Sequence, residues 1–201
     1  MTIYVLKPAF QRLLRPICNS IAKHGVTANQ ITILTIILSF LTGTAVWVFD
    51  AARWTLFLIP AMLFVRMALN AIDGMLAREH NMSTSLGAVL NELGDVASDV
   101  ALYLPFAVIS DVPVALLVLV VILAVFTELT GVVAVQIGAQ RRNDGPMGKS
   151  DRAFVFGALA LLIAVGVPTG RWLTFVFGAV LLLVALTIVN RARRALREIA
   201  Q

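Results

Sequence analysis

Residues 70–95 read NAIDGMLAREHNMSTSLGAVLNELGD, and they place charged side chains between two strongly apolar segments. The preceding segment, 56–69, is apolar except at Arg66, and the following segment, 100–109, carries no charge. Ionisable groups inside a membrane cost roughly 2.5–3.5 kcal/mol each on insertion scales, so they read as functional by default. The stretch therefore predicts a functional site within a membrane-like chain.

The composition supports a membrane protein. Of the 201 residues, 60% are hydrophobic and 13% charged, and the mean hydropathy is +0.93. A soluble domain is nearer half apolar and a quarter charged. The length suits one domain over 1–201. The single cysteine, Cys18, excludes an intrachain disulfide and is expected to be a packing residue.

The hydropathy pattern predicts an all-α, polytopic membrane protein. A span needs about 20 mostly apolar residues. Six segments qualify or nearly qualify, and they form an expected bundle over 31–190: 31–49, 54–72, 86–109, 113–137, 154–167 and 173–189. The first long apolar run begins only at Ile31, so we expect no signal peptide at residues 1–10.

Basic residues predict the orientation. Thirteen lysines and arginines fall on the side of the termini and two, Arg53 and Arg171, on the other. By the positive-inside rule, both termini, the Arg78 loop and the 141–152 loop are cytoplasmic. We expect the basic residues behind the net charge of +5 to hold the cytoplasmic loops beside anionic lipid. We expect no nucleic-acid partner.

The segment before the first span, residues 5–24, is expected to be an amphipathic helix at the membrane interface. Its apolar residues recur at helical spacing: Phe10, Leu13, Leu14, Ile17 and Ile21. Thr27 and Gln30 then match a capping box, so the next helix should begin there.

Two polar stripes fall near the cytoplasmic ends of the second and third segments. At 100° per residue, the members of one stripe fall within about 60° of one another around their helix, and the members of the other within about 120°. The first comprises Arg66, Asn70, Asp73 and Ala77, and the second comprises Gly87, Asn91, Asp95 and Asp99. A loop of roughly ten residues would let the stripes face each other in a water-accessible acidic pocket.

The residue types in this pocket favour a hard cation. Clustered oxygen ligands suit Mg²⁺ or Mn²⁺, and two histidines, His24 and His80, are too few for a typical zinc site. Metals there could bind a pyrophosphate, and Arg78 could donate to its oxygens. Small residues at 74, 77 and 87 would admit a nucleotide, or would serve helix packing.

The same stretch resembles the signature of the CDP-alcohol phosphotransferases, D-x2-D-G-x2-A-R-x8-G-x3-D-x3-D. Six of its eight named positions match with every spacing kept: Asp73, Gly74, Ala77, Arg78, Gly87 and Asp95. The chain as a whole is similar to an enterobacterial inner-membrane subgroup of that family. The resemblance implies transfer of a phosphatidyl group from a CDP-linked donor, usually CDP-diacylglycerol, to an alcohol, with release of CMP, by a homodimer.

The resemblance also implies roles for individual residues. The four aspartate positions of the family hold two divalent metals, here at Asn70, Asp73, Asn91 and Asp95, and Asp95 would also be the general base. The CDP site would comprise Asp73, Gly74, Ala77, Arg78 and Gly87.

Asn70 and Asn91 depart from the family pattern. An amide oxygen can still bind a metal, but each replacement removes one negative charge from the cluster. Three interpretations stay open: one metal suffices, Glu92 or Asp99 restores the charge, or the protein is a non-catalytic relative that binds CDP-lipid without turnover. A cation transporter is a weaker alternative, because the acids cluster at one membrane face and not at its middle.

Four further charges have two interpretations each. Lys149 and Arg152, in the sequence GKSDR, either contact a phosphate on the acceptor or set the topology. Arg66 and Glu128 either form ion pairs inside the bundle or support the pocket.

Overall fold

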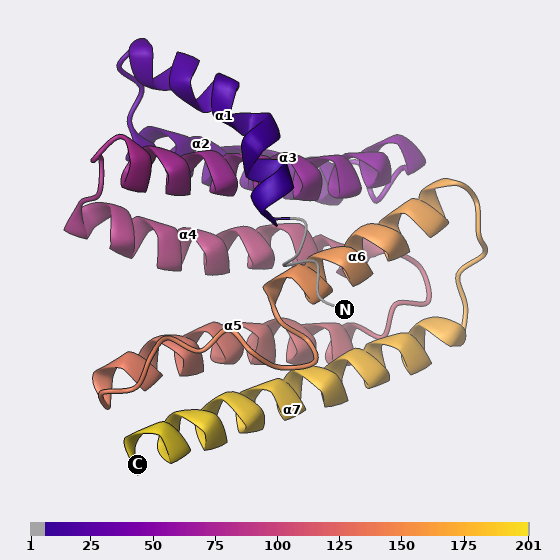
Figure 1. Ribbon diagram of the computed structural model, residues 1–201. Coiled ribbons are helices and arrows are strands. Elements are labelled where there is room, and N and C mark those ends of the chain that lie inside the picture. Colours follow the sequence, from indigo (N-terminus) through magenta and orange to yellow (C-terminus); the bar gives the residue numbers. More distant parts are fainter. Residues whose placement is uncertain (1–6, 201) are drawn as a thin grey trace. The chain divides into compact units, whose positions relative to one another are not determined.

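The computed structural model describes residues 7–200, and it assigns helices and no strand to them. Figure 1 follows the helices along the chain. Their bounds are α1 (Lys7–Lys23), α2 (Ala28–Val48), α3 (Arg53–Glu79), α4 (Ser85–Tyr103), the 3-10 helix η2 (Leu104–Val108), α5 (Val114–Gln136), α6 (Lys149–Ala164) and α7 (Trp172–Ile199). The first two residues of the predicted 5–24 helix lie outside the described residues.

The capping box at the start of α2 is confirmed. The backbone N–H of Thr27 donates to Oε1 of Gln30 at 2.8 Å, and the N–H of Gln30 donates to Oγ1 of Thr27 at 3.3 Å. These two bonds satisfy N–H groups that have no partner within the first helical turn.

The predicted length of the loop between α3 and α4 was wrong, and three helices differ in extent from the apolar segments predicted as spans. Helix α3 continues beyond residue 72 to Glu79, so the connection to α4 is five residues, 80–84, and not about ten. Helix α4 ends at Tyr103, where Pro105 follows in η2, and α6 begins at Lys149 instead of residue 154. In each case the predicted bounds followed the apolar residues. The helix itself either includes neighbouring polar residues or ends before the apolar residues do.

Four of the described helices are long and apolar enough to cross a membrane: α2, α3, α5 and α7. Helix α4 has 19 residues but carries Glu92, Asp95 and Asp99, and α6 has only 16 residues. The prediction of six spans is therefore supported by length and composition for four helices and stays a prediction for the other two.

The chain divides into two compact units. One takes the chain up to Leu41 together with Ala61–Ser98, and the other takes Thr42–Pro60 together with the chain from Asp99 onward. In the first unit, α1 packs on α2 and α3 through Leu14, Cys18 and Ile72 (Figure 1). Cys18 is 1% exposed and packs as expected, and burial raises the pKa of its thiol.

In the second unit, α5 and α7 lie side by side (Figure 1). Aromatic rings fill the space between the end of α4, α6 and α7. Tyr103 stacks on Phe156 with ring centroids 4.0 Å apart, and Phe156 meets Phe177 edge-on at 6.0 Å. This core fixes α6 beside the last turn of α4, where Asp99 lies.

Gly43 on α2 allows a close backbone approach in the second unit. A Cβ at this position would collide with the carbonyl oxygen of Ala101 on α4. We expect Gly43→Ala to lower the free energy of unfolding by about 1–3 kcal/mol, because the helices would have to separate. The measurement is the midpoint of thermal unfolding of the detergent-purified protein.

Gly178→Ala on α7 is the matched control. A Cβ there meets nothing within 4 Å, so the better helix propensity of alanine should leave stability unchanged or raise it by up to about 1 kcal/mol. Equal midpoints for the two variants would contradict the contact between Gly43 and Ala101.

Candidate active site

Asp95 is held by two donors from α3. Nη2 of Arg66 donates to the backbone oxygen of Asp95 at 2.7 Å and lies 3.4 Å from its Oδ1. Nδ2 of Asn70 donates to the same Oδ1 at 3.1 Å. Arg66 is 3% exposed, so its charge depends on protein partners more than on water, and the carboxylate of Asp95 is one of them. The expectation that Arg66 supports the pocket is consistent with these contacts.

Asp73 lies one helical turn after Asn70 on α3 and is 6% exposed. The hydroxyl of Thr32, on α2, lies 3.1 Å from Oδ2 of Asp73 and 3.1 Å from the carbonyl oxygen of Ala28. Thr32 therefore positions Asp73 from a helix that the motif does not include. The sequence showed Thr32 only as a polar residue in an apolar span.

The contacts of Asp95 with Arg66 and Asn70 bring these members of the two sequence stripes together in the first unit, whereas Asp99 belongs to the second unit. Asn91 and Glu92 are half-buried on α4. Within residues 7–200 no group of three or more His, Cys, Asp or Glu could hold a metal ion. The oxygen donors on these helices are carboxylates and amides, the kind of donor that a hard divalent ion prefers.

Arg78 lies over Gly74. A Cβ at Gly74 would come within 3.1 Å of Nη2 of Arg78, which is exposed at the end of α3. The absence of a side chain at 74 therefore leaves room for the guanidinium beside the helix. This placement suits a cation that reaches toward a phosphate oxygen.

Gly87 lies in the first turn of α4, against residues that the motif omits. Its N–H donates to Oγ1 of Thr84 at 2.9 Å, and Nδ2 of Asn29 donates to the same oxygen at 3.2 Å. A Cβ at Gly87 would meet Oδ1 of Asn29 at 2.6 Å. Thr84 is the N-cap of α4, and its position just before an apolar run could have revealed this role. Nothing in the sequence pointed to Asn29.

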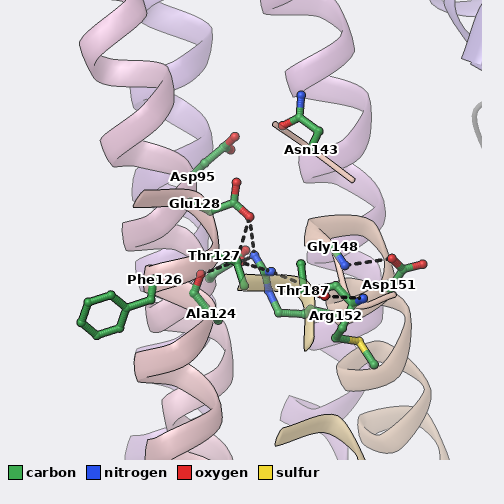
Figure 2. Close-up of polar contacts among 12 residues, drawn as sticks. Asp95, Ala124, Phe126, Thr127, Glu128, Asn143, Gly148, Asp151, Arg152 and Thr187 are labelled. Carbon is green, nitrogen blue, oxygen red and sulfur yellow. Dashed lines mark hydrogen bonds and ion pairs between the residues drawn. The ribbon is translucent and has the colours of Figure 1, made fainter. Parts of the chain in front are cut away.

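A second polar cluster lies in the second unit, around Arg152. This side chain has 0% exposure, and Figure 2 shows it reaching from α6 toward Thr127 and Glu128 on α5. Its Nη2 donates to Oδ2 of Asp99 at 2.9 Å and to Oε1 of Glu128 at 3.0 Å, and its Nη1 donates to Oγ1 of Thr127 at 2.9 Å. Two carboxylates therefore surround one buried guanidinium.

Glu128 pairs with three arginines. Besides Arg152, Nη1 of Arg191 on α7 lies 3.5 Å from its Oε1, and Nη2 of Arg141 lies 3.7 Å from its Oε2. Arg191 is 1% exposed and also donates to the backbone oxygens of Thr127 and Asp144. The expectation of an ion pair inside the bundle is confirmed for Glu128. Sequence reasoning missed the role of Arg191, which it counted only among the basic residues at the end of the chain.

Asp99 and Arg152 thus form a buried ion pair, and Lys149 is half-buried in the first turn of α6. The acceptor-binding role of Lys149 and Arg152, and the charge-restoring role of Glu92 or Asp99, stay predictions.

Comparison with known proteins shows the family of the chain. The family model for CDP-alcohol phosphatidyltransferases matches residues 25–196. The chain is 46% identical over 197 residues to the inner membrane protein YnbA of Escherichia coli, covering 98% of this chain and 97% of that one. An uncharacterised protein of Aquifex aeolicus is 36% identical over half of the chain. With the four apolar helices, the inner-membrane relative makes this chain a multi-pass membrane protein.

The fold matches solved structures of phosphatidylinositol phosphate synthase (PgsA1) from Mycobacterium tuberculosis. The structure with CDP-DAG bound gives a TM-score of 0.77 at 21% identity, covering 92% of this chain and 94% of that one. The structure in complex with manganese and citrate gives 0.75 at 20% identity, covering 90% and 87%. The membrane fold is therefore shared.

We expect Arg152→Met to lower the free energy of unfolding by about 3–5 kcal/mol, because it leaves Asp99 and Glu128 buried without their shared cation. The readout is the thermal midpoint in detergent.

Lys149→Met, three residues earlier and half-buried, is the control and should shift that midpoint little. A large loss with Lys149→Met and none with Arg152→Met would contradict the structural role of Arg152.

Proposed function

Because the chain belongs to the CDP-alcohol phosphatidyltransferase family, we propose that it transfers a phosphatidyl or similar substituted phosphate group from a CDP-linked lipid to an alcohol. The observation that carries this proposal is the pair of acids, Asp73 and Asp95, kept at motif spacing on two helices that contact each other through Asn70. The proposed donor is CDP-diacylglycerol, and the product pathway is phospholipid synthesis.

In the proposed reaction the acceptor oxygen attacks the lipid-side phosphorus and the bond from that phosphorus to the CMP oxygen breaks. Asp95 takes the acceptor proton, and CMP leaves with the bonding electrons. Arg66 and Asn70 hold the Asp95 carboxylate in place from α3. The carboxylate of Asp95 is 20% exposed, which leaves it accessible to an acceptor hydroxyl.

On the donor side, we assign the CDP site to Asp73, Gly74, Ala77, Arg78 and Gly87. Arg78 is exposed beside Gly74, where it can donate to the pyrophosphate. The residues at 74 and 77 have little or no side chain, so a nucleotide can approach the backbone of α3 closely.

We further propose that the site uses Mg²⁺ or Mn²⁺. The ligands would be Asp73 and Asp95, with amide oxygens of Asn70 or Asn91. The manganese complex of the structurally similar synthase supports this choice of ion. A bound divalent ion would neutralise the phosphate oxygens and so favour attack at phosphorus.

For the membrane arrangement, we propose one domain with six spans, α2 to α7, in a bacterial inner membrane, with the site and both termini cytoplasmic and two copies forming a homodimer. Helix α1 would lie at the interface. Leu13 is 72% and Ile17 51% exposed on α1, whereas Leu14 and Cys18 pack inward. Exposed apolar side chains beside Arg12 and Arg15 suit contact with lipid.

A second candidate function is binding of a CDP-lipid without turnover. Asn70 and Asn91 favour it, because they remove two of the four acids that the family motif carries.

The direct test is release of CMP by purified protein with Mn²⁺, CDP-diacylglycerol and a panel of alcohols. We expect CMP from at least one acceptor, and a loss of at least about a hundredfold with Asp95→Asn, because the variant lacks the base that accepts the proton.

Asp50→Asn, an exposed Asp→Asn change between α2 and α3, is the matched control and should keep full activity. If no alcohol yields CMP while calorimetry shows CDP-dependent binding, the non-catalytic function is supported instead.

The orientation can be tested with single cysteines in a Cys18→Ala background. We expect a membrane-impermeant maleimide to label Val167→Cys, between α6 and α7, in intact cells, and to label Ser83→Cys, between α3 and α4, only after lysis. The reverse pattern would contradict a cytoplasmic site.

A further inference from the structure

Helix α1 packs on the last turns of α3, the part of α3 that carries Arg78. The two helices share one buried apolar cluster, to which α1 contributes Leu14 and Cys18 and α3 contributes Ile72, Met75 and Leu76. The end of a helix has few hydrogen bonds of its own, since its last four carbonyl groups lack partners within the helix. Packing against α1 therefore helps to fix where the last turns of α3 lie.

Two polar side chains of α1 contact the two residues that directly follow Arg78. Nε and Nη2 of Arg15 donate to the two carboxylate oxygens of Glu79 at 3.1 and 2.8 Å, which makes this ion pair bidentate. Four residues further along α1, and so on the same face, Oδ1 of Asn19 lies 3.1 Å from Nε2 of His80. Both contacts hold the end of α3 from a helix outside the motif.

Arg78 belongs to the turn that these contacts hold. It is exposed, it lies beside Gly74, and its helix ends at the next residue, Glu79. A guanidinium binds a phosphate through donors in fixed directions, so a rotation of this turn would turn the donors away from the phosphate oxygens. Affinity is gained when the protein holds such a donor in its bound position before the ligand arrives.

We propose that α1 positions Arg78 for the pyrophosphate of the CDP-linked donor, and that Arg15 and Asn19 are the residues that do so. They are positioning residues, because they act on Arg78 through Glu79 and His80. This inference rests on the proposed function for the assignment of Arg78 to the donor site.

The experiment measures by calorimetry how tightly the detergent-purified full chain binds CDP with Mn²⁺ present. We expect Arg15→Met and Glu79→Met each to weaken CDP binding by about threefold, because each variant breaks the same ion pair. The double variant Arg15→Met/Glu79→Met should also lose only about threefold, whereas two independent losses would multiply to about ninefold. The result for Glu79→Met is the sharpest, because loss of an acid near a phosphate would by its charge alone strengthen binding.

Arg12→Met is the matched control, because it removes the same charge from another exposed residue of α1, and it should leave CDP binding unchanged. The thermal midpoint should stay nearly constant in all of these variants, since an exposed ion pair adds little to stability. Tighter CDP binding by Glu79→Met, or equal losses with Arg12→Met and Arg15→Met, would overturn the proposal, because charge and not position would then explain the effect.

Hydrogen–deuterium exchange of the backbone amides of residues 76–80 tests the hold of α1 on this turn without any ligand. We expect faster exchange in Arg15→Met/Asn19→Ala than in the wild type, and no change in Arg12→Met. CDP binding by the wild type together with unchanged exchange in the double variant would overturn only this inference. If the wild type binds no CDP, the proposed function fails, and the exchange alone then decides whether α1 holds the turn that carries Arg78.

Discussion

Arg152 has no exposed surface, and its charge is stable there because Asp99 and Glu128 lie within 3.0 Å of the guanidinium. Removing an ion from water costs several kcal/mol, which only well-placed partners offset. Asp99 lies on α4, Glu128 on α5 and Arg152 on α6, so three helices of the second unit must keep their register for the charges to meet. Arg191 adds α7 to the same set.

In the first unit a buried arginine also pairs with a carboxylate, but that carboxylate is partly exposed. Arg66 is as buried as Arg152, but its carboxylate partner, Asp95, is 20% exposed and is the proposed base. The ion pair that joins α3 to α4 therefore also holds the proposed base. Stability and the proposed chemistry depend on one contact in this unit, whereas in the second unit the network around Glu128 lies largely among buried residues.

Local signals in the sequence predicted local structure well. Thr27 and Gln30 located the start of α2, because a capping box depends on residues three apart. Helical spacing also placed Arg66 on the face of Asn70 and Asp73. Partners between helices were not predictable, because spacing along one helix does not give the distance to another. Glu128 was evidently an intramembrane ion, but its partners lie 24 and 63 residues away at Arg152 and Arg191. Thr32 and Asn29 were missed for the same reason.

The presence of Asn instead of Asp at position 70 has a physical consequence that the motif alone hides. Two facing carboxylates at 70 and 95 would repel each other unless a cation lay between them, so such a pair needs its metal to be stable. An amide that donates to Asp95 removes this repulsion and is stable without any ion. Arg66 lies 3.4 Å from the same carboxylate oxygen. At this point the chain therefore supplies Asp95 with a hydrogen bond and a nearby cation, where the family motif has a second acid.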